Sequence, residues 1–448
     1  MPVAELLAAL ERGARGLPLS DGEALAIGES GDGLGATIRA SAAAARNAIF
    51  GRTITYSPKV FLPLTNLCRN HCDYCSFRRS PGDPGEWTMT PVQIEDQIRA
   101  ARELGCAEAL FCLGDKPEKA FRAYRRDLAL LGHESTVDYL HRSAEVALAH
   151  GLLPHTNAGL LTNDEMARLK EVNVSLGLML ECVSARLCEP GMPHHKAPDK
   201  RPEKRLAMIA AAGRLRIPFT TGILVGIGET RRERIESLLA IRDLSRAFGH
   251  IQEVIVQNFR AVPGVPMQHA PEPDENEVTL AVAMARLILD RDVSVQAPPN
   301  LSPGATEALL ASGLNDFGGI SPVTPDYINP RHPWPHVRSL GDACERAGFA
   351  LVPRASIYDH FVSRSGFLHP RLLVPTRDVQ SRLDGTSRRL TTPPSADVPS
   401  ALPERGRNLE CTSRRLTTPP SADVPSALPE RGRNLDGTSR RESGRAIE

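Results

Sequence analysis

The chain alternates short β-rich runs with longer helical patterns from about residue 51 to residue 348. Several of the helices open with capping boxes, as at Thr90–Gln93 and Thr162–Glu165. Strands that alternate with helices in this way run parallel in one sheet. The predicted strands are residues 59–66, 107–113, 152–157, 174–181, 219–226, 253–258, 293–297 and 313–319. The pattern predicts an α/β fold and favours a TIM-like (βα) barrel, complete or nearly complete, although a doubly wound open sheet would show the same alternation.

Two segments of different character flank this region. Residues 1–50 read as an N-terminal helical lead-in, with helices over residues 3–12 and 20–27 and an Ala-rich helix that ends near residue 50. At the other end, residues 386–409 recur unchanged as residues 412–435, in a composition rich in Pro, Ser and Arg. Such a repeat cannot build an apolar core. The predicted domains are therefore residues 1–50, a barrel over 51–370, and a disordered tail over 371–448.

Charge and hydropathy exclude two classes of partner. The formal net charge of the 448-residue chain is +1, which gives no argument for a nucleic acid or an anionic membrane surface. No run of about 18 apolar residues occurs, and the first residues lack the pattern of a secretory signal. We therefore expect a cytoplasmic protein. Five cysteines in apolar or amphipathic contexts read as ordinary buried thiols: Cys106, Cys112, Cys182, Cys188 and Cys344.

Three further cysteines follow the first predicted strand in the spacing C-x-x-x-C-x-x-C, as Cys68, Cys72 and Cys75. Three thiolates hold three irons of a 4Fe-4S cluster and leave the fourth iron open for chemistry. In a barrel, catalytic residues lie at the C-terminal ends of the strands, which is where this motif falls. A zinc site would need a fourth ligand, either His71 or a distant residue. A disulfide, or an electron-carrying cluster with a distant fourth ligand, is the other alternative.

The cysteine motif resembles the signature of the radical S-adenosylmethionine (SAM) enzymes, whose open iron chelates the amino and carboxylate groups of that cofactor. The resemblance implies a 4Fe-4S cluster on Cys68, Cys72 and Cys75, with Tyr74 at the aromatic position beside the cofactor. It also implies further SAM-binding residues in three places: Gly114 and Asp115 in a Gly-Gly-Glu-type element, Glu181 after the fourth strand, and Gly222, Gly226 and Glu229 in a G-x-I-x-G-x-x-E pattern. An ordinary turn, a helix cap and a first-turn glutamate are the respective alternatives.

Polar residues on otherwise apolar strands, or just after them, are candidates for substrate binding or catalysis, because polar side chains inside a barrel need partners. They are His155, Asn157, Gln257, Asn258, Asn300, Asn315 and Asp316. His194 and His195 have the right chemistry for proton transfer. Their Pro-rich context favours a surface loop for both histidines.

Several stretches, including residues 56–68, 113–118, 154–157, 254–260, 296–301 and 315–322, resemble the first subunit of the deazaflavin synthase family. The resemblance implies a lyase that takes the adduct of a tyrosine-derived hydroxybenzyl group and 5-amino-6-ribitylaminouracil. It closes the deazaflavin ring and releases ammonia, methionine and 5′-deoxyadenosine. Because one cysteine motif is present, we expect a second radical SAM subunit as partner, and an electron donor such as ferredoxin or flavodoxin. A tyrosine-acting enzyme of the partner type and a non-catalytic Fe-S or zinc protein remain open.

Overall fold

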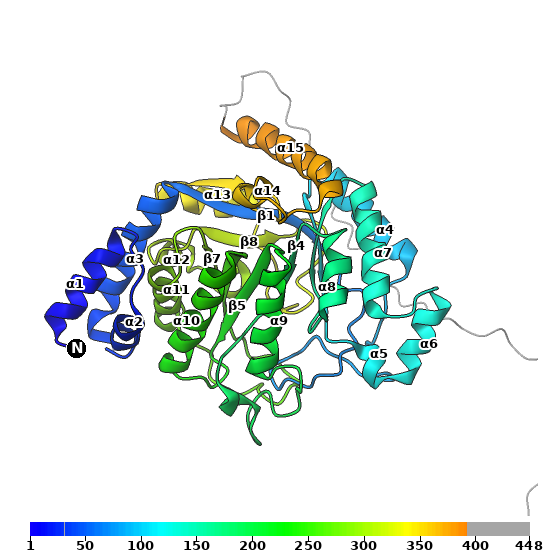
Figure 1. Ribbon diagram of the computed structural model, residues 1–448, viewed down its shortest axis with the longest axis horizontal. Helices are drawn as coiled ribbons and strands as arrows, with labels where there is room; N and C mark the ends of the chain where they lie inside the picture. Colours follow the sequence, from blue (N-terminus) through cyan, green and yellow to red (C-terminus); the bar gives the residue numbers. More distant parts are fainter. Residues whose placement is uncertain (31, 392–448) are drawn as a thin grey trace, which may run out of the picture. The chain divides into compact units, whose positions relative to one another are not determined.

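The computed structural model describes residues 1–30 and 32–391, and a closed barrel of parallel strands lies at its centre (Figure 1). The barrel strands are β1 (Thr53–Phe61), β2 (Glu108–Cys112), β3 (Leu153–Asn157), β4 (Ser175–Gly177), β5 (Phe219–Val225), β6 (Ile251–Asn258), β7 (Ser294–Gln296) and β8 (Asp316–Ile320). Each pairs with the next in chain order, and β1 closes the ring by pairing with both β8 and β2. The predicted TIM-like barrel is confirmed and complete, and the open sheet is excluded.

The first strand differs from its prediction, which was residues 59–66. β1 starts six residues earlier and ends at Phe61. Its first residues pair with a ninth parallel strand, β9 (Ala350–Pro353), which the sequence analysis did not predict. Pro63 has no N–H to donate to a ladder, so residues 62–66 lead into a loop instead of continuing the strand. The strand therefore delivers the chain to the cysteine motif earlier than predicted.

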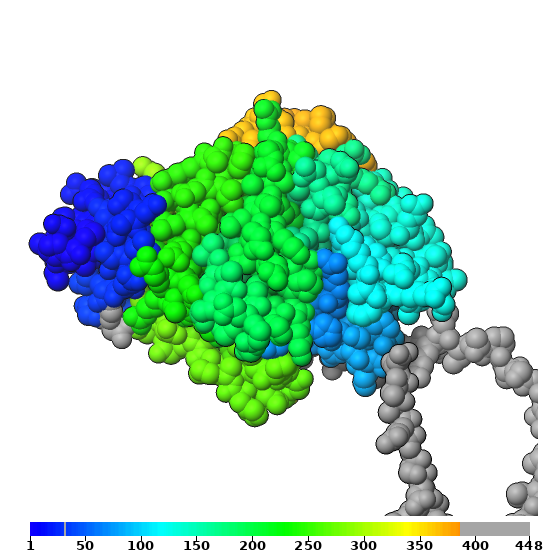
Figure 2. Space-filling model, turned by 60° about the horizontal axis from the view of Figure 1, so that its bottom comes forward, coloured from blue at the N-terminus to red at the C-terminus, as the bar shows by residue number. Residues whose placement is uncertain are grey.

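Helices surround the barrel and form the N-terminal lead-in. The lead-in is α1 (Val3–Ala14), α2 (Asp21–Gly28) and α3 (Gly35–Phe50), and it forms one side of the surface in Figure 2. The other helices up to residue 346 are α4 (Pro91–Glu103), α5 (Pro117–Ala120), α6 (Arg122–Leu130), α7 (Thr136–Ala149), α8 (Asn163–Lys170), α9 (Pro202–Arg214), α10 (Arg231–Phe248), α11 (Glu275–Ile288), α12 (Thr306–Leu310) and α13 (Val337–Arg346). α3 packs along α11, and the predicted capping boxes at Thr90 and Thr162 are present. None of the helices in the described part of the chain is long and apolar enough to cross a bilayer.

The end of the barrel at which the strands begin is closed by the segment after β9. It contains α14 (Asp359–Val362) and α15 (Leu373–Thr391), which lie over this end in Figure 1. Val379 and Leu383 of α15 are buried in an apolar cluster with Leu153 at the start of β3. The predicted tail therefore begins too early at residue 371, because these apolar positions form one face of a helix. Most of the repeat, residues 392–448, lies outside the described residues.

Candidate active site

The loop that carries the three cysteines, residues 68–75, lies at the C-terminal end of β1 and is called the cysteine loop below. Backbone hydrogen bonds join it to the segment after β4: His71 N–H donates to Lys196 O at 3.0 Å, and Asp73 N–H donates to Pro193 O at 3.0 Å. Arg69 pairs with the buried carboxylate of Asp199. The loop is thus held in place by residues more than 100 positions away.

The environment of Cys68 suits a metal-bound thiolate. Its Sγ accepts backbone N–H bonds from Asp115 at 3.2 Å and from Asn70 at 3.4 Å. Burial raises the pKa of the Cys68 thiol to about 11 and that of Cys72 still further. A bound iron ion favours the deprotonated form, so it replaces the proton that burial otherwise retains. The chemistry of this donor set fits a cluster with three thiolate ligands.

Gly114 follows β2 and makes room for Cys68. A Cβ at this position would lie 2.4 Å from the Cβ of Cys68 and 2.7 Å from its Sγ. Only a glycine allows the backbone after β2 to approach the cysteine this closely, and the approach brings the Asp115 N–H to the sulfur. The contribution of Gly114 in this structure is therefore to the position of Cys68.

A cavity of about 290 Å³ extends from the cysteine loop into the barrel. Its wall follows the period of two that strands impose, since Glu108, Leu110 and Cys112 of β2 and Glu253, Ile255 and Gln257 of β6 all line it. Asn157 of β3 also lines it near the mouth, as do all three motif cysteines. The cavity is charged and polar at depth, apolar at mid-height, and bounded by thiols at the mouth. Cys112 borders this cavity, so it is not the ordinary core thiol that the sequence predicted.

Asp115 has an unpaired oxygen in this cavity. Its Oδ2 accepts from the Leu160 N–H at 2.9 Å, whereas its buried Oδ1 has no hydrogen-bond partner. Burial, with the Asp199 carboxylate nearby, raises the pKa of Asp115 to about 6. A buried carboxylate oxygen without a donor is costly, and a bound ammonium group would satisfy it.

Glu181 is the centre of a charged group on the opposite wall. The residue has φ = 67°, a conformation that non-glycine residues adopt rarely, and it is held by a hydrogen bond from its N–H to Gly222 O at 2.9 Å. Its carboxylate accepts from Tyr74 Oη and Lys200 Nζ, and His194 Nε2 lies 3.1 Å away. Burial alone would raise the pKa of Glu181, but Lys200 and His194 hold it well below its usual value.

The two loop histidines have different positions. His194 is buried against Glu181 and Tyr74, so its prediction as a surface residue is wrong, whereas His195 is exposed as predicted. His194 faces inward because its segment folds under the cysteine loop, and burial lowers its pKa.

His155 projects from β3 into the cavity with a defined tautomer. Ser175 Oγ donates to Ser356 O at 2.7 Å, so the 2.6 Å bond between Ser175 Oγ and His155 Nδ1 must have the imidazole as donor. The other ring nitrogen, Nε2, is then an unprotonated acceptor. Burial lowers the pKa of His155 to about 4, so the ring is neutral near pH 7. It is equipped to accept a hydrogen bond or a proton.

Five predicted residues lie beside the cavity lining and serve the loops around it. Gly222 admits the Ile255 carbonyl of β6, and Gly226, at φ = 97°, admits Pro273. Glu229 accepts from the N–H groups of Gly226 and Ile227 at 2.8 Å each and pairs with Arg234. Asn258 donates to Leu301 O at 2.8 Å, and Asn300 donates to Asp326 at 2.9 Å. None of the five is among the side chains that border the cavity.

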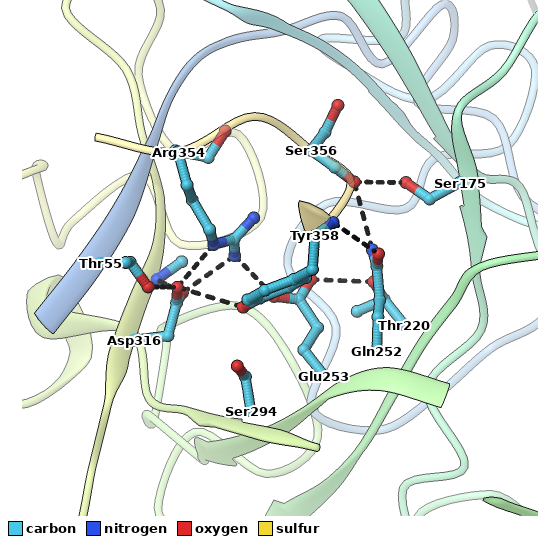
Figure 3. Close-up of polar contacts among 12 residues, drawn as sticks. Thr55, Ser175, Thr220, Gln252, Glu253, Ser294, Asp316, Arg354, Ser356 and Tyr358 are labelled. Atoms are coloured by element: carbon cyan, nitrogen blue, oxygen red, sulfur yellow. Dashed lines mark hydrogen bonds and ion pairs between the residues drawn. The ribbon is translucent and has the colours of Figure 1, made fainter. Parts of the chain in front are cut away.

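Asn315 and Asp316 lie at the start of β8, at the end of the barrel away from the cysteine loop. The prediction that they face the substrate near the strand ends is wrong for this reason. Asn315 is held by Arg286 and by the Val295 N–H. Asp316 pairs with Arg354 through two bonds of 2.6 and 2.9 Å, and Figure 3 shows Arg354 between Asp316 and Glu253.

This network closes the cavity floor. Arg354 Nη2 donates to Glu253 Oε2 at 2.6 Å, and Thr220 Oγ1 donates to Glu253 Oε1 at 2.8 Å (Figure 3). The Tyr358 hydroxyl donates within the same group. The floor is thus a set of buried charges that satisfy one another.

Sequence reasoning missed several charged residues that line the cavity: Lys59, Glu108, Lys200, Arg205, Glu253 and Arg354. Lys59, Glu108 and Glu253 had a usable signal, because each is a charged residue within or at the start of an apolar strand. The others come from loops or helices, and no local pattern distinguishes them.

Within residues 1–30 and 32–391, no group of three or more His, Cys, Asp or Glu side chains surrounds a point where a single metal ion could bind. A structural zinc site requires four such ligands around one ion.

Comparison with known proteins agrees with this geometry. Residues 62–241 match the family model of the Radical SAM superfamily. In fold, the chain resembles the FeFe-hydrogenase maturase HydG of Carboxydothermus hydrogenoformans, with a TM-score of 0.64 at 20% identity over 87% of this chain and 90% of that one. It also resembles methylornithine synthase (PylB), with a TM-score of 0.60 at 17% identity over 77% and 97% of the two chains. The barrel, its cysteine loop and the family match define a radical SAM enzyme.

Closer relatives give the family. The chain is 46% identical over 323 residues to the 7,8-didemethyl-8-hydroxy-5-deazariboflavin synthase of Methanopyrus kandleri, which covers 71% of this chain and 95% of the relative. It is 47% identical over 379 residues to the FO synthase of Nocardia farcinica, which covers 81% of this chain but 44% of that longer protein. The chain belongs to the 7,8-didemethyl-8-hydroxy-5-deazariboflavin synthase family.

Proposed function

We propose that this protein closes the deazaflavin ring of 7,8-didemethyl-8-hydroxy-5-deazariboflavin from the hydroxybenzyl–ribityldiaminouracil adduct and releases ammonia. One observation carries the proposal: three closely spaced thiols and an unpaired buried carboxylate oxygen border the same barrel cavity in a member of this family. A bound 4Fe-4S cluster and SAM would supply a 5′-deoxyadenosyl radical, which abstracts hydrogen from a bound substrate. The remaining work belongs to the side chains of this chain.

Cys68, Cys72 and Cys75 would hold the cluster. The unpaired oxygen of Asp115 is suited to accept from the ammonium group of SAM. Lys200 and Arg205 line the cavity beside the single carboxylate of Glu181, so this wall carries an excess of positive charge suited to a carboxylate. Tyr74, fixed by Glu181, would bound the cofactor on the side of the loop.

Substrate contacts are proposed for His155, Asn157 and Gln257, which line the cavity. A ring closure that expels ammonia needs a group to accept and return protons. The unprotonated Nε2 of His155 is available for that role, because Ser175 fixes the tautomer. The two side-chain amides are suited to the alternating donors and acceptors of a uracil edge.

We also propose a second radical SAM protein as the source of the adduct, because the chain covers less than half of the longer FO synthase of Nocardia farcinica. A cytoplasmic electron carrier such as ferredoxin or flavodoxin would reduce the cluster.

The test is an anaerobic assay with reconstituted protein, reductant and SAM. 5′-Deoxyadenosine and fluorescent deazaflavin are quantified with the adduct and, in parallel, with tyrosine. Deazaflavin from the adduct alone supports the proposal. Turnover of tyrosine would assign the chain to the chemistry of the partner. SAM that is never cleaved, with a cluster spectrum unchanged on SAM addition, would favour an electron carrier.

A further inference from the structure

The deep end of the cavity contains an ammonium and a carboxylate that lie side by side without pairing. Lys59 of β1 and Glu108 of β2 are register partners on adjacent strands, and both line the cavity. They are nine-tenths buried, with 8% and 7% of their surfaces exposed. No ion pair within 4.0 Å joins either side chain to a residue that the structure describes. Charges this deeply buried are costly unless something pairs with them.

Each of the two groups has unused bonding capacity. Glu108 accepts from Ser57 Oγ through Oε2, and no hydrogen bond from the described residues reaches Oε1. The Lys59 ammonium lies 4.8 Å from the ring centre of Trp334 and 5.7 Å from that of Phe61, and it donates to no described acceptor. Its stem lies over Gly319 of β8, where a Cβ would be only 2.2 Å from Lys59 Cδ. The fold thus holds the lysine in an extended position without giving it an acceptor.

The neighbouring polar groups differ in this respect. Glu253, Arg354 and Asp316 satisfy one another in the floor network (Figure 3). His155 contributes a third free atom, because its Nδ1–H is bound by Ser175 while Nε2 has no partner among the described residues. One donor group and two acceptors, Lys59 Nζ, Glu108 Oε1 and His155 Nε2, are therefore left for a ligand.

The depth of these groups indicates which part of a ligand they meet. Glu108 starts β2 and Cys112 ends it, so four residues, or about 13 Å of strand, separate the pair from the mouth. Between the two levels the wall is formed by Leu110, Met179 and Ile255, which suit a flat ring. A substrate whose reacting atom lies at the cysteine loop therefore places its far end beside Lys59 and Glu108.

We propose that Lys59 and Glu108, with His155 beside them, form a subsite that binds the polyhydroxylated side chain of the substrate. A hydroxyl donates to a carboxylate and accepts from an ammonium, so neighbouring hydroxyls on a short chain satisfy both residues at once, which one carbonyl or one amine cannot do. This inference rests on the proposed function, because that function supplies a substrate with a flat ring and a ribityl chain. It assigns the orientation: chain toward the barrel floor, ring at mid-height, reacting carbon at the cysteine loop.

The test measures binding by anaerobic calorimetry to the cluster-loaded protein with SAM. The two probes are 5-amino-6-ribitylaminouracil and its analogue with a methylamino group in place of the ribitylamino group. The variants are Lys59→Met and Glu108→Gln; the second keeps an acceptor for Ser57 and carries the test if the first does not fold. Lys119→Met and Glu134→Gln, at exposed positions, are the matched controls.

The wild type and both controls should prefer the ribityl compound. Each subsite variant should lower that preference about tenfold to a hundredfold by weakening the ribityl compound alone, because a hydrogen bond to a charged group is lost. Equal weakening of both probes, or no weakening, overturns the subsite. Equal weakening would assign Lys59 and Glu108 to the pyrimidine ring.

Turnover separates this inference from the proposed function. Deazaflavin formation with a preference that ignores Lys59 and Glu108 refutes the subsite and leaves the function standing. A lysine-dependent preference without any deazaflavin refutes the function and leaves the subsite standing. With the adduct as substrate, the variants should raise KM more than they lower kcat, since the chain is remote from the reacting carbon.

Discussion

Gly114→Ala should remove the cluster without unfolding the barrel. The added Cβ would lie 2.4 Å from the Cβ of Cys68, 2.7 Å from its Sγ and 3.1 Å from Leu67 O. Ordinary contacts begin near 3.4 Å, so the cysteine must move by about 1 Å, whereas metal–ligand distances tolerate about 0.2 Å. Overpacking of this kind costs about 1–3 kcal/mol, which a barrel of this size survives. The expected loss is therefore in iron content and not in fold.

The assay is iron and sulfide per chain after anaerobic reconstitution, with the thiolate-to-iron absorbance and a thermal melt of the same samples. Gly341→Ala is the matched control, because a Cβ there meets nothing within 4 Å and the residue lies in α13. That variant should load the cluster fully and gain about 0.5–1 kcal/mol in helix stability. A Gly114→Ala protein with full iron and unchanged turnover would refute the argument that this glycine positions Cys68.

Four further outcomes are expected. Cys72→Ser should abolish turnover and leave at most a defective cluster, measured as iron per chain; a fully active variant contradicts the three-thiolate assignment. Arg354→Met should lower the free energy of unfolding by about 3–5 kcal/mol, since it leaves two buried carboxylates unpaired, whereas the exposed pair lost in Arg346→Met should cost about 0–1 kcal/mol in the same urea melts. His155 and His250 each have a pKa of about 4 when folded against about 6.5 when unfolded, so the unfolded state binds more protons between these values; acidification from pH 7 to pH 5 should cost roughly 2 kcal/mol per ring, and a His250→Asn protein with the same pH dependence would oppose this. Deletion of residues 392–448 should leave turnover unchanged, and loss of activity in a soluble, cluster-loaded truncation would contradict the expectation from composition.

Much of the fold could be predicted because it depends on local patterns. The capping boxes at Thr90 and Thr162 and the eight β-rich runs were enough to predict a parallel barrel. β9 was not predictable, because it is short and exists through its pairing with β1, which is nearly 300 residues away in sequence. α15 was hidden for a related reason. Its buried face has meaning only against the cluster at the barrel end.

The candidate site divides in the same way. The cysteine spacing and the acidic residue after β2 are local, so Cys68, Cys72, Cys75 and Asp115 were found in the chain. Asn315 and Asp316 were misjudged because the strand boundary was set too early. The predicted strand began at residue 313, but β8 begins at Asp316, which places both residues at its start. A shift of a few residues moves a side chain from one end of a short strand to the other.

By itself the sequence determined the class of chemistry, since three cysteines at fixed spacing after a strand suit an open-iron cluster whatever surrounds them. It also determined the barrel, because alternating strand and helix patterns leave few ways to bury their apolar faces. Only the tertiary structure decided which polar groups face the cavity and which satisfy one another. Lys59 and Glu108 lie on strands separated by about fifty residues, and their closeness without pairing comes from barrel closure alone. Whether a buried charge is paired depends on distances across the fold, and no local pattern contains those distances.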